Sequence, residues 1–94
     1  MKTYTLYTYK DIRNGPSVTE VRAQNIDNLR KNLIKLYSNR TVMTGICVND
    51  AKTGERMGWL NVNMYDVNGN LNHVWTIGRS AENRLVNPKT GALL

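Results

Sequence analysis

Apolar and polar side chains alternate along much of the chain, in short runs that end at turn residues. Residues 58–75, GWLNVNMYDVNGNLNHVW, alternate, reach Asn68-Gly69 and alternate again. Asn-Gly between two alternating runs is the strongest short-range signal for a β-hairpin. We therefore expect strands over 57–66 and 71–79, joined by a two-residue turn of the primed type.

Three further strands are expected before this hairpin. Residues 2–10 are nearly all β-forming, and Asn14-Gly15-Pro16 marks a turn after which a second strand should run over 17–23. Residues 41–49 are rich in β-branched side chains, and a loop that ends at Gly54 leads back to the strand at 57. These runs predict two more hairpin-like pairings.

A helical period separates the second strand from the third. Asn25 is a suitable N-cap and Asp27 lies in the first turn, so we expect a helix that ends near Ser38. One side of this helix should be buried and the other exposed to solvent. The apolar positions on one side are Ile26, Leu29, Leu33, Leu36 and Tyr37, and the polar positions on the other are Asp27, Asn28, Lys31, Asn32 and Lys35.

The order β-β-α-β-β-β predicts an α+β fold, an antiparallel sheet of about five strands with one long helix on one face. Residues 1–79 should form a single α+β domain. After Arg79 the alternation stops, and 80–94 is expected to be a short helix over 80–86 and a tail, both packing on the same domain.

One helix of about 14 residues spans roughly 20 Å and cannot cover both faces of five strands. The second face must be solvated, covered by the tail or reserved for a partner. In the tail-covered alternative, Leu85, Val86, Leu93 and Leu94 fold back over Trp59.

The two-residue turn sets the register of the last hairpin. It pairs Met64 with His73, Val62 with Trp75 and Leu60 with Ile77 on the packed face. The opposite face carries no charge, although about one residue in five of the chain is charged. Large aromatics among neutral polar groups are typical of an interface core that is desolvated without burying charge. The predicted partner-binding residues are Trp59, Asn61, Asn63, Tyr65, Asn72 and Val74, with Thr76 on the same face.

Positive charge gives a competing hypothesis. The net charge is +6, and residues 1–40 alone hold eight Lys/Arg against three Asp/Glu. A basic groove with aromatic platforms is how sequence-tolerant nucleic-acid binders work. In the simpler alternative, Lys31 and Lys35 are the solvated side of the helix, and Tyr4, Tyr7 and Tyr9 belong to the core. The candidate nucleic-acid-binding residues are Arg13, Arg22, Arg30, Lys31, Lys35 and Arg40.

Catalytic and metal-binding signals are weak. His73 is the only histidine and Cys47 the only thiol, so the chain cannot fill a four-ligand zinc site, and we expect His73 to be structural. The run from Asp66 to Asn70 resembles the start of a calcium loop but lacks the downstream glutamate. Phosphate-binding and nucleophile-elbow motifs are missing from the sequence. We therefore expect no enzyme activity, no metal, no cofactor and no small-molecule substrate.

The chain has no apolar run near the roughly 20 residues of a membrane span and no secretory leader pattern, so we expect a cytoplasmic protein without membrane contact. Its predicted role is to bind a protein partner, or a second copy of itself, through the neutral sheet face or the free edge of the strand over 2–10. A small accessory or inhibitor protein of a phage or mobile element would suit this description. The alternative is a basic nucleic-acid-binding module.

Overall fold

The computed structural model describes the whole chain except residues 11–13, 38–42, 66 and 81. The described residues contain the predicted strands and helix and one additional strand. The predicted strand positions 41–42 and 66 and the predicted helix end at Ser38 lie outside the described residues. The elements are β1 (Lys2–Tyr9), β2 (Ser17–Ala23), α1 (Ile26–Tyr37), β3 (Thr44–Asp50), β4 (Arg56–Tyr65), β5 (Leu71–Ile77) and β6 (Asn83–Val86).

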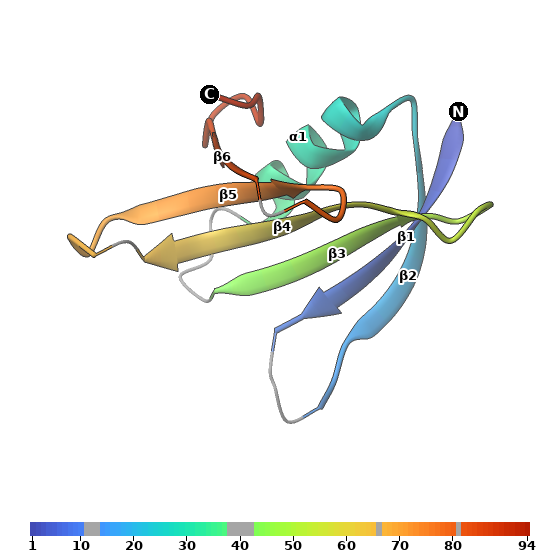
Figure 1. Cartoon of the computed structure of the whole chain (residues 1–94), viewed down its shortest axis with the longest axis horizontal. Coiled ribbons are helices and arrows are strands. Elements are labelled where there is room, and N and C mark those ends of the chain that lie inside the picture. Colours follow the sequence, from blue (N-terminus) through green and yellow to red (C-terminus); the bar gives the residue numbers. More distant parts are fainter. Residues whose placement is uncertain (11–13, 38–42, 66, 81) are drawn as a thin grey trace.

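The strands form one antiparallel sheet in the order β2-β1-β3-β4-β5-β6, and α1 lies across one of its faces (Figure 1). The predicted α+β class, with an antiparallel sheet and a long helix on one face, is confirmed. Within the described residues the sheet has six strands, where about five were expected. Among the described residues, no helix is long and apolar enough to cross a membrane.

The core lies between α1 and the sheet face that we call the inner face. Leu60 and Val62 of β4 are fully buried there, and Leu33 and Ile34 pack on them from α1 as part of the same cluster. The predicted N-cap is confirmed, because the Asn28 amide donates to Asn25 Oδ1 at 2.9 Å. The buried side of α1 is rotated from the prediction: Ile34 is buried and Leu36 is exposed.

The helix predicted over 80–86 is wrong, because residues 83–86 form the edge strand β6. Thr76 pairs with Asn83 and His73 with Val86, so β6 continues the sheet beyond β5. A seven-residue segment is too short to be a stable helix on its own propensity. Pairing with the edge of β5, together with burial of Val86, therefore decides its conformation.

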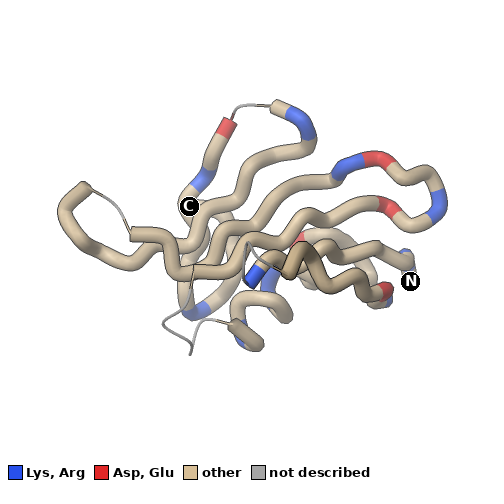
Figure 2. The backbone as a smooth tube through the Cα atoms, turned by 90° about the horizontal axis from the view of Figure 1, so that it is seen from below, with Lys and Arg blue, Asp and Glu red and all other residues tan. Residues whose placement is uncertain are grey.

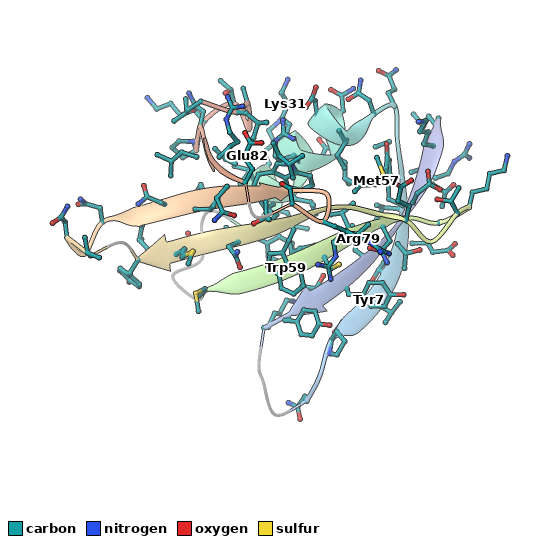
Figure 3. All side chains as sticks on the ribbon, viewed as in Figure 1. Tyr7, Lys31, Met57, Trp59, Arg79 and Glu82 are labelled. Carbon is teal, nitrogen blue, oxygen red and sulfur yellow. The ribbon has the colours of Figure 1, made fainter. Side chains whose placement is uncertain are left out.

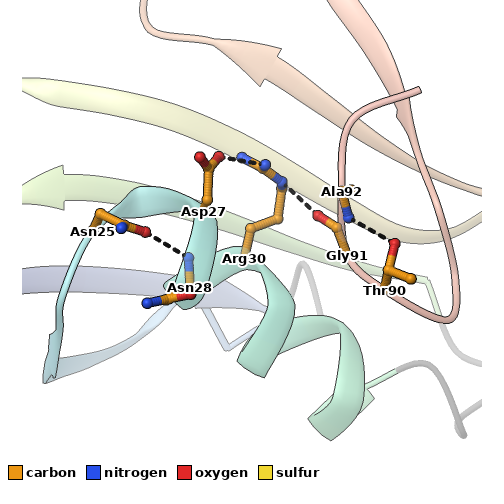
Figure 4. Close-up of polar contacts among 7 residues, drawn as sticks. All are labelled: Asn25, Asp27, Asn28, Arg30, Thr90, Gly91 and Ala92. Atoms are coloured by element: carbon orange, nitrogen blue, oxygen red, sulfur yellow. Dashed lines mark hydrogen bonds and ion pairs between the residues drawn. The ribbon is translucent and has the colours of Figure 1, made fainter.

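The tail after β6 returns along the same side of the sheet as α1 (Figure 4). The Leu94 amide donates to the Leu85 carbonyl at 2.9 Å, and Val86 forms a β-bridge with Leu93. From the helix, Arg30 Nε donates to the Gly91 carbonyl at 2.9 Å. Residues 87–94 thus join α1 to the end of the sheet.

The predicted register of the last hairpin is wrong, by two residues before a bulge in β4 and by one residue beyond it. Leu60 pairs with Trp75, not Ile77, and the pairing shifts between Asn61 and Met64. Asn63 has a φ of +61° at this bulge, a conformation that asparagine tolerates better than most side chains. The connection beyond the bulge is longer than the expected two-residue turn, since its last pair is Tyr65 with Leu71.

The sheet has two edges, and β1 is not one of them. It pairs with β2 on one side and β3 on the other, so the predicted free edge at 2–10 is wrong. The non-local pairing of β1 with β3, across the whole of β2 and α1, could not be read from local patterns. The edges are β2 and β6.

Candidate functional site at the outer sheet face

Two rows of cross-strand neighbours form the middle of the sheet face away from α1, which we call the outer face; the next row, Glu20, Thr5, Asn49 and Arg56, carries a charge at each end. Side chains alternate between faces along a strand, so residues that pair across the sheet share a face. The first row is Val18, Tyr7, Cys47, Trp59, Thr76 and Asn83, and the second is Tyr9, Gly45, Asn61, Val74 and Leu85.

Neither row contains a charged side chain. Residues 3–9, 44–49, 57–65 and 71–77, which cover most of the four inner strands, hold no Lys, Arg, Asp or Glu on either face. Figure 2 shows the middle of the sheet in tan, while the blue and red segments lie at turns and strand ends, on α1 and on the edge strands. The outer face is therefore a neutral surface with a charged border.

Trp59 lies in the middle of the first row and is held by three neighbours. Its ring stacks on Tyr9 with centroids 5.3 Å apart and planes 25° apart. Its Nε1 donates to Asn61 Oδ1 at 2.9 Å. It also covers Gly45, where an added Cβ would lie 3.0 Å from the indole Cζ2. These contacts fix the orientation of the indole ring on the outer face.

A cation borders this platform. The Arg56 guanidinium carbon lies 5.8 Å from the Trp59 ring centroid, within cation–π distance. Trp59 and Tyr7 project on the side of the sheet away from Lys31, which belongs to α1 (Figure 3). The outer face is thus separated by the thickness of the sheet from the cations of the helix.

The outer face also carries exposed apolar groups. Val18 is 61% exposed and Leu85 is 49% exposed, at opposite ends of the two rows, and Trp59 is half-buried by its own neighbours. The alternative in which the tail covers Trp59 is wrong. Leu93 packs against the core cluster on the α1 side, and Leu85 is itself part of the outer face.

The structure brings together four of the six predicted partner-binding residues. Trp59, Asn61 and Val74 belong to the two rows, and Asn72 lies next to them, paired with Met64. All four keep the predicted side because alternation along β4 before the bulge, and along β5, sets the side of each residue independently of the register.

Asn63 and Tyr65 do not share this face. At the bulge the Asn63 side chain turns inward, is 2% exposed and donates from Nδ2 to the Tyr37 carbonyl at 3.3 Å. Tyr65, beyond the bulge, pairs with Leu71 on the opposite face from Asn72. Met64 takes the outer position instead. The frequent occurrence of asparagine at positive φ was the one local signal for this bulge.

Sequence reasoning left Tyr7, Tyr9, Cys47 and Leu85 out of the site. Tyr7 and Tyr9 reach Trp59 through the pairing of β1 with β3, which is distant in sequence. Leu85 joins the outer face through β6, a segment predicted as a helix. Cys47 pairs with Trp59 in the neighbouring hairpin. Cys47 is buried in the first row, and its Sγ lies 3.4 Å from Asn49 Oδ1.

The candidate nucleic-acid-binding residues do not form one surface. Arg22 lies on β2 and belongs to the outer face of the sheet. Lys31 and Lys35 are exposed on α1, on the opposite side of the sheet. Arg30 is 3% exposed and binds within the protein, to Asp27 at 2.6 Å and over the Trp75 ring at 5.3 Å. Arg13 and Arg40 lie outside the described residues.

His73 lies on the inner face. Its Nδ1 accepts from the Asn63 amide at 3.1 Å, and burial lowers its pKa because the charged imidazolium is poorly solvated there. On the same face, burial and then the nearby charge of Asp50 raise the pKa of Tyr4. Within the described part of the chain, no three His, Cys, Asp or Glu side chains are grouped to hold a metal.

Comparisons with known proteins return no match. No protein-family model matches the chain, and neither does any curated protein or solved structure. The geometry of the outer face is therefore the basis on which a function can be argued.

Proposed function

We propose that this protein is a non-enzymatic binding module that docks on a protein partner through the outer face. The observation that carries the proposal is Trp59, fixed at the centre of two rows of uncharged side chains. Acting by occupying a surface of its partner, such a module would serve as an accessory or inhibitor protein, and we place it in the cytoplasm.

The physical reason is the low desolvation cost of this face. Burying an unpaired charge at an interface costs several kcal/mol, whereas neutral aromatic and amide groups can be covered at far lower cost. A tryptophan that is already immobilised by Tyr9, Gly45 and Asn61 loses little side-chain entropy on binding. The exposed Val18 and Leu85 extend the apolar area on both sides of it.

The test places a carboxylate on the outer face. Immobilised wild-type protein and the Val74→Asp variant are used as baits in extract from the native host, with quantitative mass spectrometry as readout. We expect specific proteins to be retained by the wild type and reduced at least tenfold by Val74→Asp, because the new charge must be desolvated. Asn32→Asp, an equal charge change on the exposed side of α1, is the matched control and should retain them. Equal retention by Val74→Asp would contradict the proposal.

A nucleic-acid binder is the second candidate. It is favoured by the stacked Tyr9–Trp59 pair beside Arg56, since bases stack on such platforms. Fluorescence polarisation of a labelled random oligonucleotide separates the two functions. Binding that weakens steeply from low to moderate salt, and that is lost in Trp59→Ala or in Lys31→Glu/Lys35→Glu, would favour this candidate over protein docking.

A further inference from the structure

We infer that the free edge of β2 is an interface for a second copy of this chain. Two β2 strands pair antiparallel about a twofold axis that passes between the two Val21 residues, and the two sheets become one. This inference concerns an edge of the sheet and does not depend on what binds the outer face.

The two edges of the sheet differ in how they are protected. Along β6 the protein's own tail occupies the edge, through the Val86–Leu93 bridge and the hydrogen bond from the Leu94 amide to the Leu85 carbonyl. Among the described residues, no segment pairs with the edge of β2 that points away from β1. An uncovered edge presents backbone donors and acceptors that another strand can complete.

β2 lacks most of the features that block edge pairing. Proteins protect edges with proline, charged side chains (lysine above all), bulges or very short strands. Of these features β2 carries charged side chains, Glu20 and Arg22. β2 is seven residues long, has no lysine, and pairs with β1 without a register shift. Pro16 stands before its first residue, and Val18, Thr19 and Val21 are β-branched. The strand is therefore a regular template for a further strand.

The charges of β2 complement themselves in one register. Glu20 and Arg22 are exposed and lie opposite Thr5 and Thr3, on the outer side of the sheet. In an antiparallel pair centred on Val21, Glu20 of each copy faces Arg22 of the other. Directly opposed side chains have Cβ atoms about 5 Å apart, close enough for ion pairing.

The neighbouring registers are disfavoured. Shifting the pair by two residues keeps the faces aligned but places Glu20 opposite Glu20, or Arg22 opposite Arg22. A shift by one residue joins the outer face of one copy to the inner face of the other. The register centred on Val21 alone gives two equivalent ion pairs, as a twofold interface requires.

The decisive experiment uses two complementary charge reversals in sedimentation equilibrium. In Glu20→Arg the opposed residues are both arginine, and in Arg22→Glu they are both glutamate. We expect a wild-type dimer, self-association weakened on the order of tenfold or more in each variant, and a heterodimer restored when the two variants are mixed in equal amounts.

Glu55→Arg and Lys89→Glu are the matched controls. They change the net charge by the same amounts at exposed positions away from β2, and both should dimerise like the wild type. Recovery in the mixture also shows that neither variant failed through misfolding.

Three results would overturn the inference. One is a wild-type chain that stays monomeric up to about 1 mM. Another is a dimer unaffected by either reversal. The third is a dimer lost in Val74→Asp and kept in Glu20→Arg, which would place the contact on the outer face. Partner capture that survives in Glu20→Arg but not in Val74→Asp supports the proposed function separately, whatever the fate of the dimer.

Discussion

Each tryptophan of this protein lies against a glycine of the sheet. Trp75 covers Gly58 on the inner face, where an added Cβ would lie 2.0 Å from the indole Cζ2. Trp59 covers Gly45 on the outer face, where the corresponding distance is 3.0 Å. Trp75 is buried and cannot move away, while Trp59 has solvent on one side. The same substitution should therefore have different costs at the two glycines.

We expect Gly58→Ala to lower the free energy of unfolding by about 3 kcal/mol, because the added methyl group forces the buried Trp75 ring out of place. Gly45→Ala should cost less than about 1 kcal/mol, since a small shift of Trp59 relieves the contact and alanine reduces the entropy of the unfolded chain. Urea denaturation of both variants measures the difference. Equal losses at the two positions would contradict the packing of Trp75 on Gly58.

His73 should make stability dependent on pH. Burial lowers its pKa in the folded protein, so below about pH 6.5, the ordinary histidine pKa, the unfolded chain binds more protons than the folded one. The contribution of the neutral imidazole is complete above that pH and is lost as the pH falls through the folded-state pKa.

His73→Asn tests this dependence. The asparagine side-chain oxygen can accept from the Asn63 amide as Nδ1 does, but it does not titrate in this range. We expect urea midpoints measured at pH 7.5, 6.0 and 5.0 to fall less steeply in the variant than in the wild type. Parallel pH profiles would show that another group causes the acid sensitivity.

At the scale of elements, Arg30 is the link between helix, tail and sheet. Its Nε donates to the Gly91 carbonyl and its Nη2 lies 2.6 Å from Asp27 Oδ1 (Figure 4). Its guanidinium also lies over the Trp75 ring. The guanidinium is buried, whereas the Asp27 side chain is 74% exposed. Arg30 therefore stabilises the fold mainly through its buried hydrogen bond to the tail, and the exposed ion pair with Asp27 contributes little.

Arg30→Ala is expected to lower the free energy of unfolding by roughly 2–4 kcal/mol, through an unpaired Gly91 carbonyl and a cavity beside Trp75. Amide hydrogen exchange should become faster across 87–94, whose packing loses its anchor. Asp27→Asn, which removes the exposed ion pair alone, should cost about 1 kcal/mol or less. A tail that stays protected in Arg30→Ala would contradict this role.

At the scale of the whole molecule, the described residues form one helix that packs on a sheet of six strands. The twelve residues of α1 span about 18 Å, while six strands extend roughly 24 Å across the sheet. The helix and tail together cover the inner face, and they leave the outer face to its own side chains. Trp75 is thereby buried and Trp59 only half-buried.

This asymmetry predicts the fluorescence of the isolated protein. Acrylamide should quench part of the wild-type tryptophan emission, because it reaches the half-buried Trp59 but not the buried Trp75. In Trp59→Phe the quenchable part should be lost, while the emission of Trp75 remains. Persistent quenching in Trp59→Phe would mean that Trp75, and not the outer face, is open to solvent.

Local patterns were sufficient for β1 to β5, for the helix and for the uncharged centre of the outer face. Alternation is a property of the extended backbone, so Trp59, Asn61 and Val74 share a side whatever strands lie beside them. The Asn25 cap and the period of α1 are also set within a few residues. Their energies are local, and the sequence alone determined them.

Tertiary structure decided the rest, because those features depend on partners distant in sequence. The segment 83–86 is a strand because it pairs with the edge of β5. Arg30 is buried because the tail packs against α1, where Gly91 accepts its hydrogen bond. Pairing of β1 with β3 made β2 the free edge, and the bulge at Asn63 removed that residue from the outer face. In each case contacts formed only in the folded chain outweighed a weak local preference.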